Sequence, residues 1–220
     1  MQLSKSTVHS LLSTLLQLGY VQQEEREGKY SLGLKLFELG QVVYYSMDLR
    51  AISMPYLTEL SKIDEETIHL GVLSGGEVVY VDKVDSPRSI RTTSKIGKRS
   101  PVHCTGLGKV LLSSLSDDEI KNIIESKGLA KYTDNTITDP VILFQHIQEI
   151  RKNGFALDNE EIEEGLVCSA APIKNALGET IAAISVSGPA HRLTQERLPK
   201  VTEDVIVACR EISRKLGYKA

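Results

Sequence analysis

The chain has 220 residues, and its hydrophobic fraction of 41% is ordinary for a globular protein. This length allows one large core or two smaller ones. The formal net charge of −3 excludes a general binder of polyanions. No apolar run approaches the roughly 18 residues of a membrane span, and no signal peptide opens the chain.

The three cysteines, Cys104, Cys168 and Cys209, are odd in number and widely spaced. Such spacing is typical of free thiols in a reducing compartment and not of a disulfide framework. We therefore expect a cytoplasmic protein that does not contact a membrane.

The segment 4–16 predicts an amphipathic helix with Ser4 or Ser6 as its N-cap. Its apolar residues repeat at the spacing of one helix face: Val8, Leu11, Leu12 and Leu15. Gly19 ends the helix. Two short β-like runs, 20–23 and 29–32, then form a hairpin.

A helix followed at once by a hairpin is typical of the second half of a winged helix-turn-helix, whose helix enters the major groove of DNA. An ordinary amphipathic helix packed on a domain is the alternative. Only three residues precede this helix, so we expect its apolar face to lack part of a winged-helix core. The candidate DNA contacts are polar residues of the helix and the hairpin turn: Lys5, Ser6, Thr7, His9, Ser10 and Arg26.

The segment 34–47 predicts a linker helix whose apolar residues pack on a partner subunit, on the second domain or in a core. A further helix over 49–63 contains Pro55, which we expect to bend it. We therefore divide the chain into a partial winged helix-turn-helix at 1–33, a linker helix at 34–47 and a larger domain at 48–220.

The larger domain opens with a predicted antiparallel hairpin, 67–73 with 78–82, because both runs alternate in polarity. His69 falls in the polar phase and is predicted to lie at the surface. The segment 89–96 could form another strand.

Thr105 is a good N-cap for a short buried helix that begins at Gly106. The glycines at 106 and 108 leave the first-turn backbone N–H groups accessible, and such a helix start can bind a carboxylate or phosphate. The spacing matches neither a Walker loop nor a Rossmann fingerprint.

His103, Cys104 and Cys168 suggest a metal site, but they lack the spacing of known ligand motifs. We therefore predict no metal and no cofactor.

The remaining elements are helices starting near Asp117 and at Pro140, strands over 166–173 and 180–187, and a last helix over 195–216 with Cys209 in the core. The acids between 158 and 164 are interpreted as a polar loop over a pocket, with those at 160, 161, 163 and 164 in a solvated lid. Helices mixed with antiparallel strand pairs predict an α+β domain.

Four blocks of the sequence, taken in order, resemble the IclR family of bacterial transcriptional regulators over nearly the whole chain. The blocks are 5–9 with 19–21, 101–109, 158–168, and 170–173 through 185–189. The resemblance implies a winged helix-turn-helix, a linker helix and a GAF-like effector domain. It also implies dimers or tetramers that bind operator DNA and small metabolites, often carboxylates.

By this resemblance, the ligand anchors are the backbone amides of Gly106 and Leu107 and the side chains of Asp158, Cys168, Ser185 and Ser187. Two wall positions that the family often fills with leucine are Ser89 and Thr92, which suggests a more polar ligand. The sequence of residues 158–168 most resembles that of regulators of sugar-acid catabolism, such as the repressor that responds to 2-keto-3-deoxygluconate.

The main hypothesis is a repressor, not an enzyme, whose operator affinity is controlled by a small carboxylate or sugar acid. Two alternatives are an enzyme that acts on a small keto acid with Cys168 as nucleophile, and a redox or metal sensor that uses Cys104 and Cys168.

Overall fold

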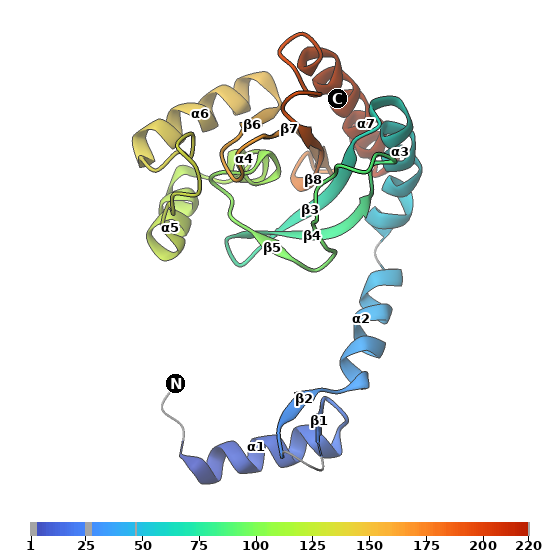
Figure 1. Ribbon diagram of the computed structural model, residues 1–220, viewed down its shortest axis with the longest axis vertical. Coiled ribbons are helices and arrows are strands. Elements are labelled where there is room, and N and C mark those ends of the chain that lie inside the picture. Colours follow the sequence, from blue (N-terminus) through green and yellow to red (C-terminus); the bar gives the residue numbers. More distant parts are fainter. Residues whose placement is uncertain (1–3, 25–27, 47, 220) are drawn as a thin grey trace. The chain divides into compact units, whose positions relative to one another are not determined.

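A computed structural model describes residues 4–24, 28–46 and 48–219 of the chain. The chain divides into two compact units, residues 1–48 and 49–220. Both are drawn in Figure 1, and each is described by itself.

The first unit contains helix α1 (Lys5–Gln17), hairpin strands β1 (Val21–Gln23) and β2 (Tyr30–Leu32), and helix α2 (Leu34–Ser46). Ser4 caps α1 by accepting a hydrogen bond from the Thr7 amide at 3.2 Å, as predicted. Gly19 follows the helix with a φ of +74°, which favours glycine. The two strands pair antiparallel, with Gln22 opposite Ser31, so the predicted helix and hairpin are confirmed.

The second unit is built on an antiparallel sheet of six strands in the order β5-β4-β3-β8-β7-β6. The strands are β3 (Thr67–Ser74), β4 (Glu77–Val84), β5 (Arg99–Ser100), β6 (Ala156–Asn159), β7 (Leu166–Lys174) and β8 (Thr180–Pro189). The long strands β3, β8 and β7 lie inside the sheet, so each is paired with a neighbour on both edges.

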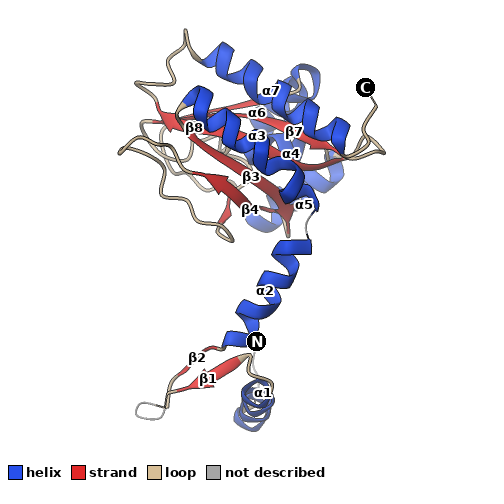
Figure 2. Ribbon diagram, turned by 90° about the vertical axis from the view of Figure 1, so that its right-hand side faces the viewer, coloured by secondary structure: helices blue, strands red, loops and turns tan. Residues whose placement is uncertain are grey.

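Five helices pack around this sheet: α3 (Asp48–Asp64), α4 (Gly106–Ser113), α5 (Asp117–Lys127), α6 (Pro140–Asn153) and α7 (Leu198–Lys215). Helices α3 and α7 cover one face and α4 covers the other, with α5 and α6 outside α4 (Figures 1 and 2). The predicted signals of α6 are confirmed: Asp139 caps it, Pro140 is its first residue, and Gly154 ends it in the left-handed conformation.

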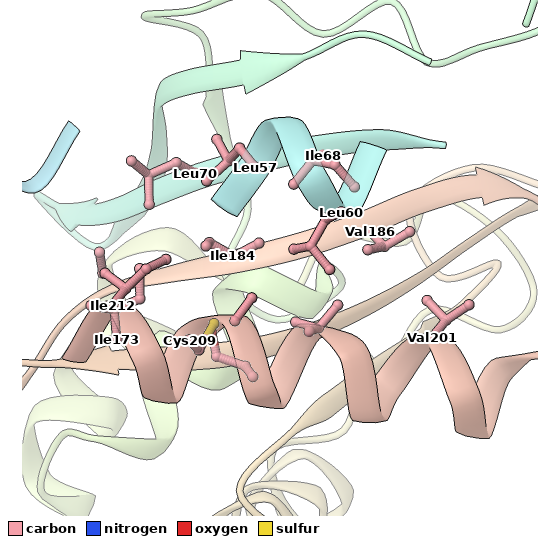
Figure 3. Close-up of a cluster of buried hydrophobic side chains, with 14 of the residues drawn as sticks. Leu57, Leu60, Ile68, Leu70, Ile173, Ile184, Val186, Val201, Cys209 and Ile212 are labelled. Carbon is pink, nitrogen blue, oxygen red and sulfur yellow. The ribbon is translucent and has the colours of Figure 1, made fainter. Parts of the chain in front are cut away.

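The α3/α7 face holds the larger aliphatic core. Figure 3 shows Leu57 and Leu60 of α3 meeting Ile184 of β8 and Ile212 of α7. Cys209 lies in this core and is 1% exposed, as predicted from its place on the helix stripe. Each such fully buried aliphatic side chain contributes roughly 1.5–3 kcal/mol to the folded state.

The α4 face is built from smaller residues. Ala156, Ala170 and Ala183 contact the α4 side of the core, and a Cβ on Gly106 would lie 3.3 Å from the Ala170 Cβ. These small residues let the start of α4 approach the sheet closely.

The predicted α+β class is confirmed by helices on both faces of an antiparallel sheet. Two local predictions are wrong. The segment 89–96 is a loop, because β4 pairs instead with Arg99–Ser100. Part of the predicted acidic loop is strand β6, which pairs with β7. Among the described residues, no helix is both long and apolar enough to cross a membrane.

Candidate functional site

A cavity of about 110 Å³ lies between the sheet and the start of α4. We call it the α4 cavity. Strands β3, β4, β6, β7 and β8 contribute to it, as do the loops before α4 and after β6. Its lining residues are His69, Tyr80, Thr92, Thr93, Ser94, Lys98, Ser100, Thr105, Gly106, Leu107, Asp158, Ile162, Glu163, Leu166, Cys168, Ser185 and Ser187.

The start of α4 forms one wall. Thr105 caps the helix by accepting from the Gly108 amide at 3.1 Å, while the Lys109 amide donates to the Thr105 carbonyl at 3.0 Å. The amides of Gly106 and Leu107 belong to the first turn, where an α-helix has no intrahelical acceptor to offer. They therefore present donors, at the positive end of the helix dipole, to the cavity wall.

The sheet forms the opposite wall, because every second residue of a strand faces the same side. On β8 these residues are Ser185 and Ser187, 3% and 4% exposed. Cys168 of β7 lies opposite Ser187, and Asp158 of β6 lies opposite Cys168. Three neighbouring strands thus place a carboxyl, a thiol and a hydroxyl in one row.

His69 belongs to this wall, which corrects its prediction as a surface residue, because it is 3% exposed. It sits on β3, whose two edges pair with β4 and β8, and its side chain lies on the sheet face that α4 and the adjacent loops cover. Burial lowers the pKa of the His69 ring to about 4, so the ring is neutral at pH 7. The near-absence of charge over 67–73 was the sequence signal for a buried strand.

A hydrogen-bond chain runs from the sheet to the loop between β4 and β5. The Ser185 and Ser187 hydroxyls lie 3.3 Å apart, and Ser187 Oγ lies 3.3 Å from His69 Nδ1. His69 Nε2 lies 2.6 Å from the hydroxyl of Ser94, and the His69 ring packs on Tyr80 at 5.0 Å between centroids. This chain holds the loop segment 92–94 against the cavity.

Asp158 is fully buried, with 0% exposure. Its Oδ1 accepts from the Glu161 amide at 2.9 Å, whereas its Oδ2 has no hydrogen-bond partner among the described residues. Burial raises the pKa of the Asp158 carboxyl to about 7. An unpaired buried carboxyl oxygen is costly, so this atom is a strong candidate for a ligand contact.

Cys168 is a protonated thiol in this wall. Burial raises its pKa well above the ordinary value, and the nearby Asp158 carboxyl acts in the same direction. The Cys104 thiol has a pKa raised to about 12 by burial. A nucleophilic or redox-sensing cysteine needs a depressed pKa and access to solvent, so these environments argue against both cysteine alternatives.

The segment after β6 differs from a solvated lid at two of its four acids, because Glu160 is half-buried and Glu161 is buried. Glu163 and Glu164 are exposed as expected, but Glu161 is 5% exposed. Its carboxylate pairs with the ammonium of Lys109, which is itself 1% exposed. Glu160 takes a φ of +59° and accepts from the Gly165 amide at 2.6 Å, which closes the turn.

Seven of the eight predicted ligand residues surround the α4 cavity. The exception is Ser89, which is exposed in the loop after β4 and does not line the cavity. Thr92 does line it, with a buried Oγ1 that has no partner among the described residues. Sequence reasoning missed His69, Tyr80, Ser94, Lys98 and Ser100, which the fold brings to the cavity.

His103, Cys104 and Cys168, which the sequence raised as a possible metal site, belong to no metal-binding cluster among the described residues. The described residues contain no group of three or more His, Cys, Asp or Glu side chains able to hold a metal ion. His103 Nε2 instead lies 3.0 Å from the Ala130 carbonyl oxygen.

The polar face of α1 is open in the first unit. Lys5, Ser6, Thr7, His9 and Ser10 are all exposed, and Ser4 Oγ lies 2.8 Å from both the Ser6 and the Thr7 hydroxyl. The apolar face is also open, as expected: Leu11 is 52% and Leu15 37% exposed. Arg26 lies outside the described residues.

Comparison with known proteins agrees with this architecture. Residues 41–214 match the family described as "Bacterial transcriptional regulator IclR C-terminal". Residues 1–25 match the IclR helix-turn-helix domain. The chain belongs to the IclR family of transcriptional regulators.

Relatives in this family extend along nearly the whole chain. The transcriptional regulator KdgR of Escherichia coli K12 is 43% identical over 98% of this chain and 82% of its own length. The regulator XynR of the same strain is 40% identical over 100% of this chain and 87% of its own length. These relatives are named transcriptional regulators, so the chain is classed as a regulator and not as an enzyme.

Solved structures give the same result. The Thermotoga maritima IclR structure superposes with a TM-score of 0.79 at 35% identity, covering 98% of this chain and 87% of that one. The C-terminal domain of E. coli KdgR gives 0.71 at 39% identity, covering 78% and 100%. A Microbacterium hydrocarbonoxydans IclR homologue complexed with 4-hydroxybenzoate gives 0.81 at 25% identity, covering 97% and 86%.

Proposed function

We propose that this regulator is a repressor whose affinity for operator DNA is controlled by a small hydroxylated carboxylic acid bound in the α4 cavity. One observation carries the proposal. The cavity combines open amides at the start of α4 with the Oδ2 of the fully buried Asp158, an atom that has no hydrogen-bond partner among the described residues. A ligand that satisfies both needs an anionic group and a hydrogen-bond donor.

The anionic group is a carboxylate at the amides of Gly106 and Leu107. Hydrogen bonds to an ionised acceptor are about twice as strong as neutral ones, and the helix start favours negative charge. Lys98 lines the cavity with a further cationic side chain. Ser185 and Ser187 supply hydroxyls beside them.

The donor is a ligand hydroxyl directed at Asp158, because this carboxyl, when ionised above its pKa of about 7, only accepts hydrogen bonds. The rest of the lining is also rich in hydroxyls, including Tyr80, Thr92, Thr93, Ser94 and Ser100. The volume of about 110 Å³ is small for a ligand of nucleotide size. A compact sugar acid fits this chemistry better than a nucleotide or an apolar ligand.

The relatives support this class of ligand. The structure of the M. hydrocarbonoxydans homologue contains 4-hydroxybenzoate, which is a carboxylate with a hydroxyl group. The AllR relative of E. coli K12, 33% identical over 100% of this chain and 81% of its own length, is named a transcriptional repressor. These names favour repression and a hydroxylated acid for this chain as well.

The DNA contacts in this proposal are Lys5, Ser6, Thr7, His9 and Ser10 on α1 in the major groove, with the β1–β2 hairpin as the wing. Arg26, outside the described residues, is a further candidate DNA contact in this proposal. The ligand acts by shifting the population between two arrangements of the protein. The segment after β6 closes over the cavity, and α2 carries the change to the DNA-binding unit.

We also propose a homodimer or a tetramer, because two helix-turn-helix units read two half-sites. Helix α2 presents exposed apolar side chains that fit a subunit contact: Leu36, Phe37, Leu39 and Val42. Light scattering after size-exclusion chromatography measures the assembly, and a monomer at micromolar concentration would contradict this part.

A thermal-shift screen of pyruvate, gluconate, galacturonate and 2-keto-3-deoxygluconate tests the ligand. We expect a hydroxylated acid to raise the melting temperature, since a ligand at a hundredfold excess over Kd stabilises by about 2.7 kcal/mol. Duplexes selected from a random library by the full chain then report DNA affinity with and without that acid. An acid that binds but leaves DNA affinity unchanged would contradict the proposed control.

Two variants accompany the screen: a double substitution on β8 and a matched control on β7. Ser185→Ala with Ser187→Ala removes two cavity hydroxyls, and we expect it to abolish the shift. Ser169→Ala changes a β7 serine that instead pairs with Thr202 of α7 at 2.8 Å, and it should leave the shift intact. A shift that survives in the β8 double variant would mean that the ligand binds elsewhere, and equal losses in both variants would mean that the loss is not specific to the cavity.

A further inference from the structure

A buried ion pair supports the α4 cavity from behind. The Lys109 ammonium on α4 pairs with the Glu161 carboxylate after β6, and the two side chains are 1% and 7% exposed. Neither residue lines the α4 cavity. Both line a separate hollow of about 300 Å³, formed mainly by α6 and β6. The pair therefore touches the supports of the site and not the ligand.

Lys109 connects the pair to the amide wall. It lies in the second half of the first turn of α4, two residues after Leu107, and its own amide donates to the carbonyl of the cap residue Thr105. A helix turn moves as a unit because its backbone is hydrogen-bonded. The position of the Lys109 side chain therefore fixes the position of the amides of Gly106 and Leu107.

Glu161 connects the pair to the carboxyl wall. Its amide donates to Asp158 Oδ1 at 2.9 Å, and its Oε1 lies 3.4 Å from the Asn159 amide. Its carbonyl accepts from the Thr136 hydroxyl at 2.6 Å. These bonds orient the Asp158 carboxyl, so that Oδ2 is the oxygen left without a partner among the described residues.

We propose that Lys109 and Glu161 are positioning residues that fix the separation between the α4 amides and Asp158, and thereby select the length of acid that the regulator recognises. The inference rests on the proposed function and specifies its ligand selectivity. A lysine is almost never fully buried unless it is paired. An apolar contact here would let α4 slide on the sheet, whereas an ion pair holds one distance.

The test compares two acids that share a 2-keto carboxylate. Pyruvate has no hydroxyl tail, and 2-keto-3-deoxygluconate has one. Calorimetry on the full chain gives the dissociation constant of pyruvate divided by that of 2-keto-3-deoxygluconate. This ratio is high when the distance from the amides to Asp158 suits the longer acid. In the double variant Lys109→Met with Glu161→Gln, we expect this ratio to fall about tenfold, which is about 1.4 kcal/mol.

A matched control replaces an exposed pair. Lys121 and Asp118 of α5 lie 3.1 Å apart with side chains 58% and 90% exposed. Lys121→Met with Asp118→Asn makes the same loss of charge, and the ratio should stay as in the wild type. A folded Lys109/Glu161 variant that keeps the wild-type ratio overturns the inference. So does an equal loss of affinity for both acids, which is the result of a purely structural role.

Lys109→Arg covers the case in which the double variant does not fold. It keeps the charge but lengthens the tether, so we expect a reduced ratio in a folded protein. An unchanged ratio in this variant overturns the inference.

A ligand-free measurement separates this inference from the proposed function. The amides of Gly108 and Glu161 are both hydrogen-bonded, to Thr105 Oγ1 and Asp158 Oδ1. We expect hydrogen exchange at both amides to speed up in Lys109→Arg without any ligand, while Lys121→Met leaves them unchanged. If the wild type binds neither acid, the proposed ligand class is wrong. Unchanged exchange rates in Lys109→Arg would overturn the positioning role, whatever the ligand.

Discussion

The two faces of the six-stranded sheet come from the same strands, but one carries the main hydrophobic core and the other the candidate ligand cavity. On the α3/α7 face, β8 contributes Ile184 and Val186, both 0% exposed. On the α4 face, the alternate residues Ser185 and Ser187 line a cavity. Period-two alternation therefore assigns stability to one face and ligand contacts to the other.

The difference lies in side-chain volume as well as polarity. Large aliphatic residues on the α3/α7 face interlock with two helices. On the α4 face, alanines bring α4 close at one end of the strands, whereas Asp158, Cys168 and the serines leave space at the other. A regulator with this design can change its cavity residues without losing its main core.

The largest expected effect comes from the buried pair on the α4 face. Lys109→Met leaves Glu161 charged, buried and unpaired, which should cost about 3–5 kcal/mol of folding stability. Adding Glu161→Leu should recover much of this loss, because an apolar pair can replace a buried ion pair. Urea unfolding of the three proteins measures both effects, and a single variant as stable as wild type would refute the assignment.

On the α3/α7 face, a substitution should lower folding stability without changing ligand selectivity. Ile184→Ala creates a cavity in the larger core and should cost about 2–5 kcal/mol. Because Ile184 points away from the α4 cavity, the ratio of affinities for pyruvate and 2-keto-3-deoxygluconate should not change. A large shift in that ratio would show that the two faces are not independent.

The raised pKa of Asp158, on the α4 face, makes the folding stability of the protein depend on pH. Its folded-state pKa of about 7 lies above the ordinary value of 3.8, so the folded protein binds the proton more tightly than the unfolded chain. The resulting stability is present at acidic pH and is lost as pH rises from about 4 to about 7. Asp158→Asn should remove this loss and be relatively more stable at pH 8 than at pH 4.

Thermal melts of wild type and Asp158→Asn across pH 4–8 check this sign. His69 stays neutral over most of this window, because its pKa is lowered to about 4. The Cys168 thiol stays protonated. A ligand hydroxyl that donates to the ionised carboxylate should also bind more tightly above pH 7, and parallel melting curves would contradict the assignment.

The smallest effect on folding is expected at Ser185, the neighbour of Ile184. Ser185→Ala removes one neutral hydrogen bond and should change stability by less than about 1 kcal/mol. Affinity for a hydroxylated acid should nevertheless fall about tenfold. Calorimetry and melting of Ile184→Ala and Ser185→Ala together give the most direct test of the two-face description, and a large loss of stability at Ser185 would contradict it.

Local signals predicted most of the elements. Helix α6 was defined by Asp139, Pro140 and Gly154, because caps act within a few residues of the chain. The hairpin of β3 and β4 followed from alternating polarity. The loop 89–96 was mistaken for a strand because alternation alone does not show whether a neighbouring strand is available for pairing.

The ligand residues divide in the same way. Gly106 and Leu107 were accessible to sequence reasoning because an N-cap and two glycines mark an open helix start. His69 was not, since its burial depends on strands β4 and β8 pairing on either side of it. Glu161 resembled a solvated acid because its partner, Lys109, is 52 residues away in the chain.

The sequence by itself determined the family, the α+β class and the chemistry of the helix start, because these depend on local spacing and on motifs. Only the tertiary structure decided which polar residues share a cavity and which charges are buried. Strand pairing and the packing of α4 bring together residues that are far apart in the chain. The desolvation of Asp158, His69 and Lys109 arises only when those surfaces close.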